Sequence, residues 1–189
     1  MKLNKLQKKI GISFKDVQTL TQALTHKSFD TKNNYEKLEF LGDRVLGFVI
    51  SKKLLELYPN EKVGMIDKKL ANLVNKNKCF EIGKELELDN YILTGNTEKK
   101  KKVNIEKKII SDCCESLIGA IYIDKGFEVS SKFILNYWKN YLNLSDITVI
   151  DSKTRLQEYS LKKFKALPIY KLISNTCLLY TSPSPRDGS

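Results

Sequence analysis

The chain has 189 residues, of which 41% are apolar, and its 33 basic against 22 acidic residues give a net charge of +11. An apolar content of this size excludes wholesale disorder. The sequence contains no run near 18 uninterrupted apolar residues, so we expect a soluble, cytoplasmic protein with no membrane segment. The excess positive charge favours a polyanionic partner. A general abundance of lysine would explain it equally well.

Apolar residues recur at spacings of three and four residues from residue 3 to residue 142, which predicts an all-α domain over residues 1–142. Asp16 precedes the second of these helices and is expected to cap it, and Pro59 ends the long third one. The predicted helices are Leu3–Ile10, Val17–Leu24, Leu38–Tyr58, Ile66–Val74, Phe80–Leu86, Ile105–Ile123 and Val129–Leu142. Gly95 and the lysine-rich run after it predict a polar loop.

The pattern changes after residue 142. Residues 143–151 break the helical spacing and are interpreted as a linker. Residues 153–163 predict a helix, and residues 167–174 predict the first strand of the chain. Residues 176–189 contain two prolines and three serines and predict no element, so we interpret them as an unstructured or non-native tail. One helix and one strand do not bury a core, so the C-terminal unit, residues 152–175, looks incomplete.

Two pairs of acids lie within apolar helical segments. Glu39 and Asp43 are four residues apart, and Asp112 and Glu115 are three apart, so each pair shares a helical face. Buried carboxylates are costly unless a cation compensates them. If the two helices pack together, the four acids meet, and oxygen ligands suit Mg²⁺, with Mn²⁺ as a substitute. The alternative for either pair alone is a solvated helix face.

Glycines stand close to both acid pairs. Gly42 lies between Glu39 and Asp43, and Gly119 follows Glu115 by four residues. Since a glycine lets two backbones approach closely, we expect these positions to form the contact between the acid-bearing helices.

The cysteines and the histidine indicate neither zinc nor a disulfide. His26 is the one histidine, and the four cysteines lack metal-type spacing. Neighbouring Cys113 and Cys114 point in different directions on a helix and are interpreted as small core residues. No organic cofactor is predicted.

Three motifs, in order along the chain, resemble the ribonuclease III family. Residues 34–46, Asn-Tyr-Glu-Lys-Leu-Glu-Phe-Leu-Gly-Asp-Arg-Val-Leu, resemble its nine-residue signature with flanks. Residues 111–124 resemble its second acidic helix, and residues 24–29, Leu-Thr-His-Lys-Ser-Phe, match its usual opening. The resemblance covers residues 5–142 as the endonuclease domain and residues 151–175 as the start of a double-stranded-RNA-binding domain.

The resemblance implies a Mg²⁺-dependent, all-helical homodimer that cleaves double-stranded RNA, each subunit cutting one strand to 5′-phosphate and 3′-hydroxyl ends. Ribosomal and messenger RNA processing is the implied role. The metal ligands would be Glu39, Asp43, Asp112 and Glu115, with Asp43 and Glu115 as the catalytic pair.

Other residues receive roles by the same resemblance. Glu36 would lie at the dimer interface or the cleft rim. Phe40 and Leu41 are expected there on a separate ground, because they sit beside the acids on a face that the domain's own core does not fully cover. Gln157 and Glu158 would contact the RNA minor groove. His26 would be a packing residue, with proton transfer as the less favoured role.

The sequence departs from the family pattern at two places. Val63 stands where the family usually has an acid before the Gly of the next helix, and Glu61 is out of register. The match to the RNA-binding domain stops near Cys177, before its second and third strands and last helix.

Two other functions remain open at this point. One is a catalytically silent RNA-binding or ribosome-associated protein on the same fold; such relatives lose acidic ligands, whereas all four acids stand here. The other is a helical interaction module whose acids are solvated, which predicts no metal binding.

Overall fold

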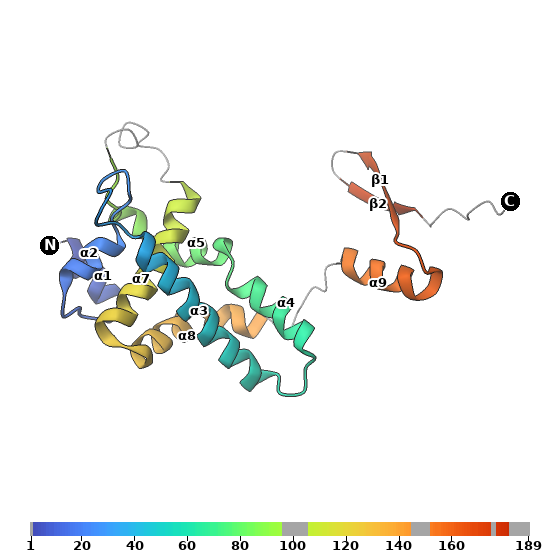
Figure 1. Cartoon of the computed structure of the whole chain (residues 1–189), viewed down its shortest axis with the longest axis horizontal. Coiled ribbons are helices and arrows are strands. Elements are labelled where there is room, and N and C mark those ends of the chain that lie inside the picture. Colours follow the sequence, from blue (N-terminus) through green and yellow to red (C-terminus); the bar gives the residue numbers. More distant parts are fainter. Residues whose placement is uncertain (1, 96–105, 145–151, 175–176, 182–189) are drawn as a thin grey trace. The chain divides into compact units, whose positions relative to one another are not determined.

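The computed structural model describes residues 2–95, 106–144, 152–174 and 177–181, and the chain divides into two compact units, Met1–Asp146 and Ile147–Ser189. The described part of the first unit is helical, which confirms the predicted all-α class. Its elements are α1 (Lys2–Ile10), α2 (Val17–Ala23), α3 (Glu36–Leu57), α4 (Val63–Leu73), α5 (Lys76–Glu85), the short 3₁₀ helix η1 (Leu88–Asn90), α7 (Lys107–Lys125) and α8 (Phe127–Leu144) (Figure 1).

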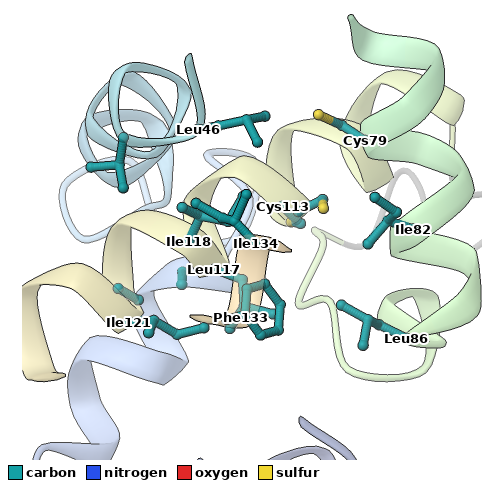
Figure 2. Packing of buried hydrophobic residues seen from close by; sticks show 14 of the residues in the cluster. Leu46, Cys79, Ile82, Leu86, Cys113, Leu117, Ile118, Ile121, Phe133 and Ile134 are labelled. Atoms are coloured by element: carbon teal, nitrogen blue, oxygen red, sulfur yellow. The ribbon is translucent and has the colours of Figure 1, made fainter. Parts of the chain in front are cut away.

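Helix α7 is the centre of the first unit. Every residue from Ile109 to Ile121 is buried, as expected for a helix that is apolar on nearly all sides. Helices α3, α5, α8 and α2 pack around it. Figure 2 shows side chains of α7 between those of α3, α5 and α8, with Leu46, Cys79, Ile82, Leu86, Cys113, Leu117, Ile118, Ile121, Phe133 and Ile134 labelled. Asp112 and Glu115 therefore lie on the central helix of the core.

Polar contacts fix the ends of several helices. The Asp16 carboxylate accepts a hydrogen bond from the Gln18 backbone N–H at 2.9 Å, which confirms the predicted cap of α2. Asp124, near the end of α7, accepts the backbone N–H groups of Lys15 and Asp16 at 2.9 and 2.8 Å. The buried Trp138 indole N–H on α8 donates to the Leu73 carbonyl at 2.8 Å. These bonds tie the outer helices to one another and to α7.

Helix α5 begins four residues before the predicted start. The apolar pattern marked Phe80 as its first turn, but the helix starts at Lys76, after Asn75, whose side chain accepts from the Lys78 backbone N–H at 3.0 Å. The first turn carries alternating Asn and Lys, so it has no apolar stripe for the sequence pattern to detect. The missed turn contains the cation of the site described below.

Cys113 and Cys114 are small core residues, as predicted. Cys79, Cys113 and Cys114 are free thiols buried in the core. Burial raises the pKa of the Cys113 thiol, so it stays neutral. Within the described residues, no helix combines the length and apolar character needed to cross a bilayer.

The second unit holds α9 (Ser152–Phe164) and two antiparallel strands, β1 (Ile169–Ser174) and β2 (Cys177–Thr181). Tyr170 pairs with Tyr180, and Leu172 with Leu178. The second strand differs from the expectation that residues 176–189 form no element. Its Leu, Tyr and Thr residues favour extended structure, and β1 supplies a neighbouring edge, but five residues are too few to show a period in sequence.

Candidate metal centre

Three of the four predicted acids meet where α3 crosses α7. Glu39 lies in the first turn of α3, and Asp112 and Glu115 lie one turn apart on α7. Carboxylate oxygens of these three residues all lie within 4.8 Å of one another. The Asp112 and Glu115 side chains are each 4% exposed, whereas that of Glu39 is 26% exposed. The structure thus brings Glu39 to a buried pair on α7.

Two glycines make this approach possible, as predicted. A Cβ atom on Gly42 would lie 1.8 Å from the backbone oxygen of Glu115, and one on Gly119 would lie 2.2 Å from the backbone oxygen of Leu38. Real Cβ atoms do not come this close to backbone atoms. The crossing of α3 and α7 therefore needs glycine on both helices, and this close crossing places the Glu39 side chain beside the α7 acids.

A lysine ammonium lies among the three acids. Lys76 is the first residue of α5. Its Nζ donates hydrogen bonds to Glu39 Oε1 at 2.9 Å, Asp112 Oδ1 at 2.6 Å and Glu115 Oε2 at 2.8 Å. The ammonium is a stand-in cation, and its three contacts show that the carboxylates converge on a single point. A donor set of carboxylate oxygens around one positive charge fits a hard divalent cation such as Mg²⁺.

Burial and the Lys76 ammonium act in opposite directions on the acids of this cluster. Burial raises the pKa of Glu115, and the hydrogen bond from Lys76 opposes that rise. Burial likewise raises the pKa of Glu39, with Lys76 again opposing and the charge of Asp112 adding to the rise. For Lys76, burial lowers the pKa, but its hydrogen bonds to the three acids outweigh burial and hold the pKa above its ordinary value. The ammonium therefore offsets part of the cost of burying the carboxylates of Glu39 and Glu115.

Tyr35 holds the second oxygen of Asp112. The Tyr35 hydroxyl donates to Asp112 Oδ2 at 3.4 Å, and burial, followed by the charge of Asp112, raises the pKa of this phenol. The phenol therefore keeps its proton and remains a donor. The His26 ring packs on Tyr35 with centroids 5.6 Å apart, and its Nδ1 lies 2.8 Å from Ser28 Oγ. His26 contacts the ring that positions Asp112.

Asp43 is placed differently from the other three acids. Its carboxylate forms an ion pair with Arg44 and is not among the three converging groups. Asp43 does line the same pocket, which has a volume of about 450 Å³ and is lined by Glu36, Glu39, Phe40, Asp43, Lys76 and Glu115. Its charge also helps to raise the pKa of Glu115. Asp43 thus faces the site from one turn beyond Glu39.

The predicted interface residues divide into two groups. Phe40 is 66% exposed and Glu36 is exposed, and both line the pocket. Leu41 was expected on the same exposed surface but packs against the core, because it follows Phe40 by about 100° around the helix and lies on the side of buried Leu38 and Val45. Val63 begins α4 and is 80% exposed.

The predicted RNA-contacting residues belong to the second unit. Gln157 and Glu158 lie on α9, where Gln157 is half-buried. The site residue that sequence reasoning missed is Lys76. Nothing in its Asn-Lys-Asn-Lys surroundings separates it from the other basic residues of the chain.

The fold and the site define a helical protein with a largely buried cluster of carboxylates around one lysine ammonium. Residues 16–142 match the family model described as "Ribonuclease-III-like". The chain is 62% identical over 178 residues to "Ribonuclease 3" of Pelagibacter ubique, covering 93% of this chain and 80% of that relative. It is 40% identical over 181 residues to "Ribonuclease 3" of Leptospira interrogans, covering 92% and 73%.

Comparison with solved structures gives the same fold. The nuclease domain of ribonuclease III from Campylobacter jejuni superposes with a TM-score of 0.70 at 37% identity, covering 73% of this chain and 97% of that one. Dicer from Pichia stipitis, at 18% identity and a TM-score of 0.56, shares the fold. The chain belongs to the ribonuclease III family.

Proposed function

We propose that the chain is a divalent-metal-dependent endoribonuclease that hydrolyses the phosphodiester backbone of double-stranded RNA. The observation that carries this proposal is the convergence of Glu39, Asp112 and Glu115 on one cation position. The family membership and the net charge of +11 support a polyanionic duplex as substrate. Ribosomal and messenger RNA targets, and action in the cytoplasm, stay predictions made from the sequence.

In this proposal the chain's residues hold and orient a Mg²⁺ ion. When bound, Mg²⁺ supplies a water of lowered pKa and stabilises the charge that builds up on the phosphoryl oxygens. Asp112 and Glu115 would offer oxygens from the buried part of α7, and the Tyr35 hydroxyl holds the Asp112 carboxylate by a hydrogen bond. Glu39 completes the set, and Asp43, which lines the same pocket, is proposed as the fourth acid. Asp43 and Glu115 are proposed as the catalytic pair.

Cleavage of a labelled RNA duplex in Mg²⁺ and in EDTA tests the proposal. We expect defined cuts in Mg²⁺, ends with 5′-phosphate and 3′-hydroxyl groups, and no cuts in EDTA. Duplex binding without cleavage in Mg²⁺ would instead support the catalytically silent alternative. If the protein bound neither Mg²⁺ nor duplex, the solvated-acid interaction module would replace both.

We also propose that the enzyme acts as a homodimer, with Phe40 as a contact residue. Phe40 projects from α3 beside the acid pocket, and the Arg44 guanidinium lies over its ring at 5.0 Å from the centroid. A large, exposed aromatic side chain next to charged groups is typical of an interface. The solved Campylobacter jejuni domain is described as having a region involved in dimer formation, which supports the proposal.

Replacing Phe40 with Asp should weaken dimerisation by at least about tenfold. Burial of one Phe contributes about 1.5–3 kcal/mol, and a two-fold interface loses two such side chains. Sedimentation equilibrium at micromolar concentration measures the change. Val63→Asp is the control, since Val63 is even more exposed and begins a helix, where an acid is well tolerated. Equal dissociation of both variants would contradict the assigned contact.

The second unit is proposed to be part of a double-stranded-RNA-binding domain in which α9 carries Gln157 and Glu158. Its described residues supply one helix and one pair of strands, and an isolated strand pair is marginally stable. This unit should therefore add little to RNA affinity in this chain.

Removing residues 144–189 should lower duplex affinity by less than about tenfold, or 1.4 kcal/mol. The truncated chain should also keep the cleavage activity of the full chain at low ionic strength, because Glu39, Asp43, Asp112 and Glu115 remain. Filter binding of both chains over a salt series measures affinity and the number of phosphate contacts. A larger loss, with a steeper salt dependence of the full chain, would identify the second unit as a working RNA-binding module.

A further inference from the structure

Lys76 uses its whole hydrogen-bonding capacity on the acid centre. An ammonium group has three donors, and here one goes to each of Glu39, Asp112 and Glu115 at 2.6 to 2.9 Å. In an ordinary surface ion pair a lysine neutralises one carboxylate and leaves the other donors to water. This ammonium instead occupies the point on which the three acids converge.

The first turn of α5 positions Lys76 beside the acids but leaves about half of its side chain exposed to solvent. Lys76 is the first residue of α5, and the Asn75 side chain caps that helix. The Lys76 side chain is 51% exposed, in contrast to the 4% exposure of the two acids on α7. The ammonium can therefore leave the acids by rotation of its own side chain, while the helices and the core stay in place.

A divalent cation at this centre needs the position of the ammonium. Mg²⁺ binds oxygen at about 2.1 Å, so an ion held by these oxygens would lie within the space that Nζ occupies at 2.6 to 2.9 Å from the same atoms. Two positive charges at this separation also repel each other strongly. Occupation by Lys76 and occupation by Mg²⁺ thus exclude each other.

We propose that Lys76 is the resident counterion of the acid centre and a direct competitor of the divalent cation, so that metal binding expels its ammonium from the three carboxylates. This inference rests on the metal site of the proposed function. Lys76 stabilises the metal-free fold, in which three carboxylates would otherwise repel one another. It also lowers the metal affinity, because each binding event breaks three charged hydrogen bonds.

The first test compares Lys76→Met with wild type in EDTA and in Mg²⁺. We expect the substitution to lower the melting temperature in EDTA, to leave it close to wild type at saturating Mg²⁺, and to tighten Mg²⁺ binding at least about tenfold in calorimetric titration of the full chain. Lys84→Met is the matched control, because Lys84 lies on the same helix and pairs with Asp89 at 2.7 Å, away from the acids. It should change Mg²⁺ affinity less than about twofold.

Two results would overturn the proposal. An equal loss of melting temperature with and without Mg²⁺ would make Lys76 a purely structural anchor. Unchanged or weaker Mg²⁺ binding by Lys76→Met would show that the ammonium does not compete.

The second test uses the unsubstituted protein, so it does not depend on folding of the variant. The Lys76 ammonium resonance, assigned by ¹⁵N labelling, should show a slowly exchanging, hydrogen-bonded group in EDTA and lose that protection as Mg²⁺ is added. Mg²⁺ binding with an unchanged resonance would refute competition but leave the metal site intact. Absence of any Mg²⁺ binding would refute the proposed function together with this inference.

Discussion

Replacing Glu115 with Gln should lower duplex cleavage by more than about 100-fold, while the protein still folds and binds RNA. Substitutions that only support a metal ligand commonly cost 10- to 100-fold, so loss of a direct ligand should cost more. The amide keeps the shape of the side chain, which is 4% exposed in the core, but removes its charge. Burial already raises the pKa of Glu115, so a neutral group there should change stability little.

Single-turnover cleavage, circular dichroism and filter binding measure activity, folding and affinity separately. The control is Glu56→Gln, since Glu56 is an exposed acid of α3 that pairs with Lys53; its activity should stay within about twofold of wild type. Asp43→Asn in the same assay tests the fourth acid, which pairs with Arg44 outside the converging group. Near wild-type cleavage by Glu115→Gln would show that the metal position is wrongly assigned.

Gly42→Ala should destabilise the first unit by about 3 kcal/mol or more and abolish cleavage. The new Cβ would meet backbone atoms, at 1.8 Å from the Glu115 oxygen and 2.9 Å from the Gly119 nitrogen, and a backbone does not rotate away as a side chain does. Overpacking in a core costs about 1–3 kcal/mol even where side chains adapt. Helices α3 and α7 would have to separate, which carries Glu39 away from the acids of α7.

Gly47→Ala provides the opposite expectation on the same helix. A Cβ at Gly47 meets nothing within 4 Å, and alanine in a helix interior is favoured over glycine by about 0.5–1 kcal/mol. Thermal unfolding should therefore shift downward by about 10 °C for Gly42→Ala and slightly upward for Gly47→Ala. A shift of the same sign in both variants would mean that helix propensity, and not the close crossing, controls the effect.

The sequence predicted the acid pairs and their crossing because both leave local marks. Carboxylates within apolar helical runs are anomalous wherever they occur, and the glycines stand one turn or less from Glu39 and Glu115. A pairing across two helices can be inferred when each partner is unusual in its own segment. The structure adds that Asp112 and Glu115 are almost fully buried and Glu39 is not.

Lys76 could not be predicted in this way. A lysine in a polar stretch is ordinary, and its role comes from the capped start of α5, which brings residue 76 beside residues 39, 112 and 115. Leu41 was predicted together with Phe40 at the dimer interface or cleft rim, and its packing against the core was not foreseen. The side chains of neighbouring residues on a helix point about 100° apart. Leu41 therefore packs against the core, whereas Phe40 is exposed.

The burial of α7 from Ile109 to Ile121 makes one half of the acid centre more rigid than the other. Backbone amides in the middle of such a helix exchange with solvent only when the whole unit unfolds, so Asp112 and Glu115 keep their mutual geometry for as long as the protein is native. Glu39 and Lys76 each lie in the first turn of a helix, where local fraying costs far less. Asp112 and Glu115 thus keep their positions while the protein is folded, whereas Glu39 and Lys76 can leave the centre and return to it.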